Sequence, residues 1–372
     1  MTKYCTKIVH LTSAHPRYDT RIFIKMCCSL AKKYSVTLIV ADGQGDEVKN
    51  NVTICDVGKS DSRIKRILGT TKRVFDKAVD LDADIYHLHD PELMPIGLKL
   101  KRLGMKVIFD AHEDLPKQLL SKPYLNRMSR LILSKLATLY ENHACNKFDA
   151  IVAATPYIRD KFLYINKMVV DVNNFPILGE LSGSDIDWNN KENKVCYIGG
   201  LEEVRGVSEI VDAISLTKST VTLAIAGKFS DISFEKAVRS KNGWDKVEDL
   251  GWIGRDEIAE TLSESIAGLV TLKPAINYLD SLPVKMFEYM SAGIPVIASN
   301  FPYWENIINE SGCGLCVDPS KPHSIAEAIE YMVNNPKEAQ EMGLKGLNSV
   351  ILKYNWALEE VKLYRLYQDV LS

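Results

Sequence analysis

The sequence predicts an α/β protein of two domains. Its 372 residues exceed what one domain usually holds. Short apolar runs typical of buried strands alternate with segments of helical periodicity in both halves, which is the pattern of parallel sheets built from β-α-β units. A polar stretch rich in glycine, serine, aspartate and asparagine separates the two series. We expect a first domain over residues 1–178, a linker over 179–193, a second domain over 194–354 and a terminal helix over 355–372.

Bulk composition narrows the class of protein. The chain is 46% hydrophobic and 25% charged, with a net charge of −2, so it has apolar material for two cores and no charge excess for nucleic acid. Its eight cysteines include no His/Cys cluster that suggests zinc, and residues 1–7 do not resemble a signal peptide. No apolar run approaches the roughly 18 residues that span a bilayer. We therefore expect a cytoplasmic protein with reduced thiols.

The first domain opens with a β-α-β unit. Residues 7–12 and 36–40 have the apolar pattern of strands, and residues 21–33 have helical spacing. The loop between the first strand and this helix lies at the carboxyl end of the strand, where open α/β sheets bind ligands.

Three charged residues of that loop are candidates for ligand contact, namely Arg17, Asp19 and Arg21. The alternative is that Asp19 caps the following helix and that both arginines are solvated. The strand over residues 84–89 adds His87 and His89 on one face. Two histidines without an evident third ligand are weak grounds for a metal site, so we predict none.

The most informative stretch of the second domain is residues 280–299, which we expect to form a helix, a tight stop and a buried strand. Asp280 and Ser281 are good helix N-caps, Pro283 suits the first turn, and Gly293 suits the C-terminus. Such a helix start can hold an anion through its backbone N–H groups and its dipole. The alternative is a solvated helix face with a surface pair between Lys285 and Glu288.

This stretch resembles the donor-site signature of the GT-B glycosyltransferases of family 4. The resemblance rests on Asp280, seven intervening residues, Glu288 and then Tyr-Met-Ser-Ala-Gly-Ile-Pro-Val-Ile-Ala. It implies two Rossmann-like domains facing across a cleft, with the last helix crossing back onto the first domain. It also implies that Asp280 lies beside the transferred sugar and that Glu288 binds the ribose hydroxyls. The family usually has glutamate where this chain has Asp280.

A glycine loop after the strand at 194–198 resembles the family's diphosphate-binding loop. Gly199 and Gly200 form its turn, and Arg205 matches the second of two basic positions. Gly200 occupies the first, so one expected cation is missing. We infer that Lys285 supplies it from the opposing helix, which requires its side chain to point inward.

Other donor contacts follow from the same resemblance. Leu282 and Pro283 lie at the helix start, and the backbone of Ile253 is placed to meet the nucleobase. We expect Trp252 to lie in the core rather than to stack on the base.

The first domain adds a catalytic candidate. The loop over residues 13–21 resembles the His-Pro-x-x-Asp-Thr-Arg-Ile-Phe variant of bacterial surface-polysaccharide glycosyltransferases. In the family a strand-end histidine lies over the donor sugar, and here that residue is His112, which joins Asp280 at the catalytic centre. The alternative for His112 is a helix-capping role. The resemblance places Arg17, Asp19, Arg21 and His89 near the diphosphate or the acceptor.

The implied activity is retaining, metal-independent sugar transfer without a cofactor. A nucleotide diphosphate-sugar would be the donor, and a glycan or polyprenyl-diphosphate-linked molecule the acceptor, in surface polysaccharide synthesis. The alternatives are a nucleotide-sugar epimerase or hydrolase on the same fold, or a non-catalytic membrane-docked scaffold.

Two basic stretches with apolar stripes lie in the first domain, over residues 59–77 and 117–147. Basic amphipathic helices suit an anionic membrane surface, here the inner face of the plasma membrane. The alternative for each is an ordinary helix packed on its own core.

Overall fold

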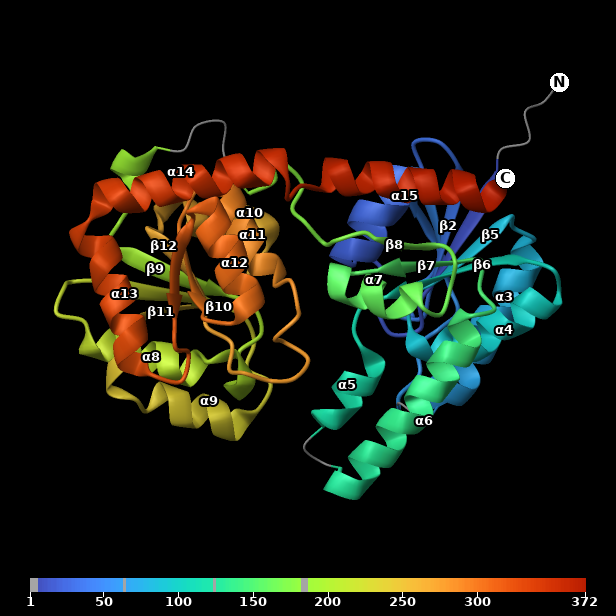
Figure 1. Cartoon of the computed structure of the whole chain (residues 1–372), viewed down its shortest axis with the longest axis horizontal. Coiled ribbons are helices and arrows are strands. Elements are labelled where there is room, and N and C mark those ends of the chain that lie inside the picture. Colours follow the sequence, from blue (N-terminus) through green and yellow to red (C-terminus); the bar gives the residue numbers. More distant parts are fainter. Residues whose placement is uncertain (1–5, 63–64, 123–124, 182–186) are drawn as a thin grey trace. The chain divides into compact units, whose positions relative to one another are not determined.

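The computed structural model describes residues 6–62, 65–122, 125–181 and 187–372. The chain divides into two compact units, one of Met1–Asn174 with Leu358–Ser372 and the other of Phe175–Ala357 (Figure 1). The division falls before the expected linker. Residues 182–186 of that segment lie outside the described residues. The residues on either side of them belong to the second unit, where Leu181 is buried in one apolar cluster and Trp188 packs against another.

The first unit contains an eight-stranded sheet in the order β3-β4-β2-β1-β5-β6-β7-β8. All neighbouring strands are parallel except β3 and β4. Both faces of its central strands are buried, as expected of a sheet covered by helices, and one of them carries an apolar cluster that includes Leu11, Leu88 and Phe109. The strands are β1 (Lys7–Leu11), β2 (Ser35–Val40), β3 (Glu47–Lys49), β4 (Val52–Asp56), β5 (Ile85–Leu88), β6 (Lys106–Ala111), β7 (Ala150–Ala153) and β8 (Val169–Asp171).

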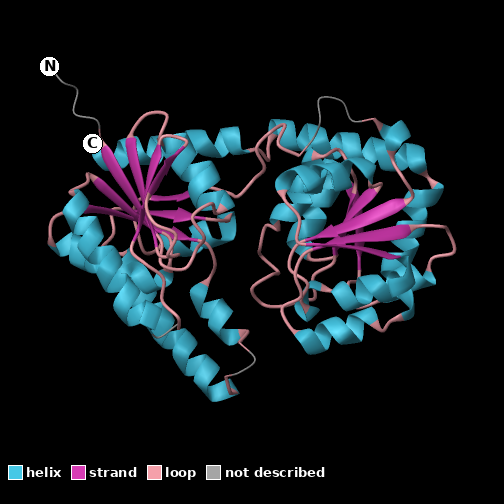
Figure 2. Ribbon diagram, turned by 180° about the vertical axis from the view of Figure 1, so that it is seen from behind, coloured by secondary structure: helices cyan, strands magenta, loops and turns pink. Residues whose placement is uncertain are grey.

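Helices lie on both faces of this sheet (Figure 2). The expected helix over 21–33 is present, but it starts with π-type turns, and Asp19 caps it by accepting from the N–H groups of Arg21 and Ile22. The helical elements of this unit are η1 (Thr20–Cys27), α1 (Cys28–Leu30), η2 (Arg66–Thr70), α3 (Thr71–Leu81), η3 (Pro91–Leu93), α4 (Met94–Arg102), α5 (Leu115–Leu120), α6 (Arg127–Cys145), α7 (Pro156–Leu163) and the terminal α15 (Trp356–Leu371).

The second unit contains a six-stranded parallel sheet in the order β11-β10-β9-β12-β13-β14. Its strands are β9 (Lys194–Ile198), β10 (Thr222–Ala226), β11 (Val247–Gly251), β12 (Ala267–Val270), β13 (Val296–Ser299) and β14 (Gly314–Val317). Its helical elements are η4 (Trp188–Asn190), η5 (Glu203–Arg205), α8 (Val207–Leu216), α9 (Ile232–Arg239), η6 (Asn242–Lys246), α10 (Arg255–Glu264), α11 (Val284–Ser291), α12 (Pro302–Ser311), α13 (Pro322–Asn334) and α14 (Pro336–Leu352).

The strand orders fix where ligands can bind. In the second sheet β9 and β12 are neighbours. The chain runs from β9 to β10 on one side and from β12 to β13 on the other, so the loops after β9 and β12 diverge at the carboxyl ends of the two strands. Crevices at such switch points are the usual ligand sites of open parallel sheets. The glycine loop follows β9, and the segment that leads into α11 follows β12. In the first sheet β1 and β5 meet in the same way.

Candidate functional site

Two cationic side chains of the second unit lie against the glycine turn after β9. A Cβ atom added to Gly199 would lie 3.0 Å from Nζ of Lys285, and one added to Gly200 would lie 3.6 Å from Nε of Arg205. Gly199 also has φ of +142°, a conformation that L side chains rarely adopt. The absence of side chains at this turn therefore leaves room beside both cations.

Lys285 points inward from α11. Its side chain is buried, and Nζ lies 3.8 Å from the centroid of the Tyr197 ring. No described residue offers this ammonium a hydrogen bond. Burial, and next the positive charge of Arg205, lower the pKa of Lys285 to about 7.

Arg205 completes the cationic pair. Its Nε is buried and likewise finds no hydrogen-bond acceptor among the described residues. The nearest carboxylate is that of Glu202, 3.7 Å away. A buried charge without a hydrogen-bond partner, as at Lys285, is costly, and the adjacent guanidinium of Arg205 is 31% exposed and has an unsatisfied Nε. An anion bound at the turn would satisfy both groups.

The start of α11 differs from the expectation. The helix begins at Val284 with Pro283 as its N-cap residue and no side-chain cap, so the prediction that Asp280 and Ser281 cap it was wrong. The extended ψ of Pro283 delays the helix, and the hydroxyl of Ser281 instead donates to the carbonyl of Tyr278. Asp280 and Leu282 lie in the partly buried segment before the helix.

Glu288 lies one turn further along α11. Its Oε1 accepts from Nη1 of Arg255 at 2.7 Å, and Arg255 also pairs with Glu180 at 2.8 Å. The carboxylate is mostly buried, and its charge acts on the pKa of Lys285 together with that of Arg205. The two cations and Glu288 thus lie near one another in the second unit. Lys285 and Glu288 do not form the solvated surface pair that was the alternative.

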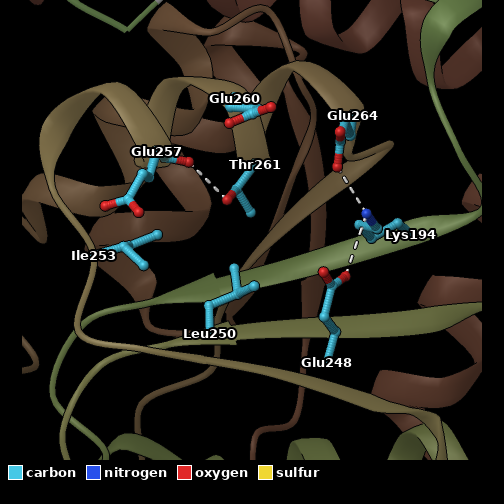
Figure 3. Close-up of a pocket in the computed structure, with 8 residues that line it drawn as sticks. All are labelled: Lys194, Glu248, Leu250, Ile253, Glu257, Glu260, Thr261 and Glu264. Carbon is cyan, nitrogen blue, oxygen red and sulfur yellow. Dashed lines mark hydrogen bonds and ion pairs between the residues drawn. The ribbon is translucent and has the colours of Figure 1, made fainter.

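Ile253 lines a hollow of about 270 Å³ in the same unit (Figure 3). The hollow is strongly acidic, and Lys194 is its one basic residue, bridging Glu248 and Glu264. Its negative charge does not suit a diphosphate, and none of the three charged residues described above lines it. The residues that line it are Lys194, Glu248, Leu250, Ile253, Glu257, Glu260, Thr261 and Glu264.

Trp252, expected in the core, is 72% exposed, so that prediction was wrong. It follows β11, the edge strand of the sheet, where little packs against it. Nζ of Lys228 lies 5.8 Å from its ring.

In the first unit, His112 lies at the accessible end of a cluster of histidines. Its Nε2 is 2.8 Å from Oδ2 of Asp110, and its side chain is 20% exposed. The rings of His15 and His89 flank it at centroid distances of 5.0 and 5.6 Å.

Asp110 holds this histidine in place. Its carboxylate is fully buried and accepts from Nε and Nη2 of Arg21 at 2.9 and 2.6 Å. Burial alone would raise the pKa of Asp110, but the charges of Arg21 and His112 hold it well below its usual range. Asp110 was missed from the sequence, although its spacing of two from His112 puts both on one face of the strand.

The loop arginines do not contact solvent as one alternative supposed, nor are they presented for a ligand. Arg21 is buried against Asp110, and its Nη1 donates to the carbonyl of Val172. Arg17 is buried between Asp42 and Glu47, at 2.7 and 2.6 Å. Both arginines stabilise the unit.

His89, expected near the acceptor, is buried in a chain of hydrogen bonds. Its Nδ1 lies 3.1 Å from Asp110, and a carboxylate can only accept, so Nδ1 carries the proton. Nε2 of this neutral ring then accepts from Nδ1 of His10 at 2.8 Å. Nε2 of His10 in turn accepts from the hydroxyl of Tyr367 on α15, at 3.2 Å.

The chain ends at His87, whose Nδ1 donates to the oxygen of Tyr367 at 2.7 Å. Nε2 of His87 has no partner among the described residues. Burial lowers the pKa of His10, His87 and His89, so all three rings are neutral. The tautomer of each histidine in this series of hydrogen bonds therefore follows from the buried carboxylate of Asp110.

A third histidine lies beside His87 and His89. It is His10 on β1, which is the register partner of His87 on the neighbouring strand β5. The ring nitrogens of His10, His87 and His89 lie within 4.8 Å of one another, a spacing that admits a metal ion. However, the two facing nitrogens of His10 and His89 already share a hydrogen bond. A hydrogen-bonded chain explains these contacts better than a ligand set.

Comparisons with known proteins agree with this architecture. The family described as "Glycosyltransferase Family 4" matches residues 21–166, and that described as "Glycosyl transferases group 1" matches residues 183–348. A phosphatidyl-myo-inositol mannosyltransferase of Mycobacterium leprae is 22% identical over 305 residues, covering 78% of this chain and 75% of the relative. The D-rhamnosyltransferase WbpZ of Pseudomonas aeruginosa is 24% identical over 278 residues, covering 70% of this chain and 67% of the relative.

Solved structures share the whole fold. Sucrose-phosphate synthase from Thermosynechococcus elongatus superposes with a TM-score of 0.79 at 17% identity, covering 98% of this chain and 99% of that one. The Anabaena protein HepE, in complex with UDP-glucose, superposes with a TM-score of 0.75 at 13% identity, with the same coverage. Among the described residues, every helix is too short or too polar to cross a lipid bilayer. The chain belongs to family 4 of the glycosyltransferases and is an enzyme of the GT-B fold.

Proposed function

We propose that the protein transfers a sugar from a nucleotide diphosphate-sugar to a glycan or lipid-linked acceptor, with retention of the anomeric configuration and without a metal ion. The observation that carries this proposal is the pair of cations beside the turn of Gly199 and Gly200, in which Nζ of Lys285 and Nε of Arg205 are both buried without a hydrogen-bond acceptor among the described residues. A diphosphate offers the hydrogen-bond acceptors that both of these nitrogen atoms lack, and a negative charge beside the buried ammonium.

The same pair supports metal-independent departure of the nucleotide. As the bond between the sugar C1 and the diphosphate oxygen breaks, negative charge grows on the phosphates. A guanidinium, an ammonium and the start of α11 stabilise that charge, which is the role a bound cation plays in other transferases. The new bond forms between C1 and the acceptor oxygen, whose proton passes to the departing phosphate.

The remaining roles follow the family signature. Glu288 binds the ribose hydroxyls, Asp280 lies beside the transferred sugar, and Leu282 and Pro283 line the approach to α11. His112 donates a hydrogen bond to the sugar in the transition state. The backbone of Ile253 and the exposed ring of Trp252 are the candidates for contact with the base.

The names of two relatives and one loop of the first unit favour a particular class of acceptor. One relative is named for a lipid, phosphatidyl-myo-inositol, and another for the transfer of D-rhamnose. Together with the His-Pro-x-x-Asp-Thr-Arg-Ile-Phe loop, these names favour surface polysaccharide synthesis on a glycan or polyprenyl-diphosphate carrier. The sugar transfer would take place in the cytoplasm, at the inner face of the plasma membrane.

Three measurements test the activity. A thermal-shift screen with UDP, GDP, ADP and CMP identifies the base, since a ligand that binds only the folded state raises the unfolding temperature. The product anomer, read by NMR, tests the mechanism, and an inverted product would refute retention. Rapid conversion of the donor without acceptor would favour an epimerase or hydrolase, and no nucleotide binding would favour a scaffold.

A further inference from the structure

Large apolar side chains gather on the outer side of α6. Each is at least 40% exposed, and the most exposed, Met128, reaches 66%. Their spacing of three and four residues places them on one broad face of the helix, which we call the α6 apolar face. Its members are Met128, Leu131, Ile132, Leu133, Leu136, Leu139 and Tyr140.

The opposite side of α6 is polar and faces the protein. The hydroxyl of Ser134 donates to the carbonyl of Pro116 in α5 at 3.0 Å, and Glu141 is buried against Lys161. The two helices lie side by side and extend away from the strands of the first unit (Figures 1 and 2). An ordinary surface helix turns its apolar stripe to the core, so this helix has the reverse arrangement.

The surroundings of the face are basic. Residues 115–140 contain no aspartate or glutamate and five basic residues. The carboxylates that bracket the stretch, Asp114 and Glu141, both pair with Lys161 and are mostly buried. The five are Lys117, Lys122, Arg127, Arg130 and Lys135.

The other basic stretch, residues 59–77, behaves differently, and its residues 63–64 lie outside the described ones. Arg66 pairs with Glu92, and Arg73 donates to the carbonyls of Val57 and Gly58. The buried face of α3 packs on the core. This stretch is an ordinary amphipathic segment, apart from the exposed Ile67 and Leu68 in η2.

We propose that the α6 apolar face docks the protein onto an anionic lipid bilayer. Its leucines and isoleucine would enter the boundary between headgroups and acyl chains, while Arg127 and Lys135 would contact anionic headgroups. Patches of this kind on a soluble surface mark an interaction site. A symmetric contact with a second copy would bring two basic surfaces together, whereas an anionic bilayer neutralises them.

The purpose of this docking, which is to bring the active site to a lipid-linked acceptor, rests on the proposed function, but the docking itself does not. Vesicle binding therefore needs to be measured apart from catalysis. Nucleotide binding by the same samples shows whether the donor site is intact.

The test is co-sedimentation of the full chain with vesicles of phosphatidylglycerol and phosphatidylcholine, compared with phosphatidylcholine alone. The native protein is expected to bind the anionic vesicles and to be released by salt. The double variant I132D/L136D is expected to lose about tenfold or more of that binding, because carboxylates would have to enter the bilayer boundary. Both positions are exposed, so its unfolding temperature and nucleotide binding should match the native protein.

A matched control places the same charge on exposed apolar residues away from α6. Ile232 on α9 and Val361 on α15 are 72% and 65% exposed, and the double variant I232D/V361D should bind vesicles as the native protein does. The proposal is overturned if native protein fails to bind anionic vesicles, or if I132D/L136D binds as well as the control. It is also overturned if sedimentation velocity shows a native dimer that I132D/L136D separates, since the face would then bind a second copy.

Discussion

The ammonium of Lys285 lies over the ring of Tyr197, 3.8 Å from its centroid, and makes no hydrogen bond to any described residue. An aromatic face offers a cation some attraction but cannot replace the hydrogen bonds that water supplied. Burial and the nearby Arg205 lower the pKa of Lys285 to about 7. Binding of an anion should therefore be coupled to protonation of Lys285.

This state predicts a pH dependence of nucleotide affinity. Bound diphosphate favours the charged lysine and raises its pKa, so binding takes up a proton above pH 7 and affinity falls as the pH rises from about 7 to 9. Below about pH 7 the lysine is already charged, and this contribution becomes flat. Calorimetric titration with UDP in buffers of different ionisation enthalpy measures the proton uptake. The Lys285→Gln variant should bind more weakly and lose the uptake, and an unchanged uptake would refute the assignment.

Glu288 is predicted to recognise the ribose. Replacing it by glutamine keeps the shape but weakens a charge-assisted hydrogen bond, which should cost about 1–2 kcal/mol of UDP affinity. The same variant should bind 2′-deoxy-UDP nearly as well as the native protein does. If Glu288→Gln weakens UDP and 2′-deoxy-UDP equally, then Glu288 acts through its partner Arg255 and not on the sugar hydroxyl.

The buried histidines predict a loss of stability in acid. Burial lowers the pKa of His10, His87 and His89, so the unfolded chain binds more protons than the folded one below about pH 6.5. Stability should accordingly be present above that pH and fall as the pH decreases below it. Calorimetric unfolding of the full chain should show the fall, and it should be smaller in His87→Gln. An equal fall in the variant would mean that other groups cause it.

Asp110 is predicted to be a major determinant of stability in the first unit. Asp110→Asn leaves Arg21 buried without its carboxylate, which should cost about 3–5 kcal/mol in denaturant unfolding. Lys32→Ala breaks the exposed pair with Glu360 and should cost less than about 1 kcal/mol. Similar losses in the two variants would show that the ion pair between Arg21 and Asp110 is not special.

The sequence predicted the two α/β units because strand and helix periodicities are local properties. The resemblance to the family signature led us to expect a glycine turn with Arg205 after it and an inward direction for Lys285, and Lys285 is indeed buried. The sequence placed the start of α11 too early, because good capping residues such as Asp280 and Ser281 do not show which residue the chain uses.

Burial was harder to predict than position. Arg17, Arg21 and His89 have ligand-binding side chains, yet the structure uses them in internal pairs whose partners, Asp42 and Asp110, lie far away in sequence. Only the folded register brings those carboxylates to the loop. Trp252 shows the reverse, since its large apolar ring suggested burial and the edge position of β11 left it exposed.

The most direct test of the account is calorimetric titration of nucleoside diphosphates into the native protein and into Arg205→Ala. At least one diphosphate should bind the native protein, and the variant should bind it with about 1.5–3 kcal/mol less free energy, because a charge-assisted contact is lost. If no diphosphate binds, or if Arg205→Ala binds as tightly as the native protein, the pair of cations beside the glycine turn is not the donor site.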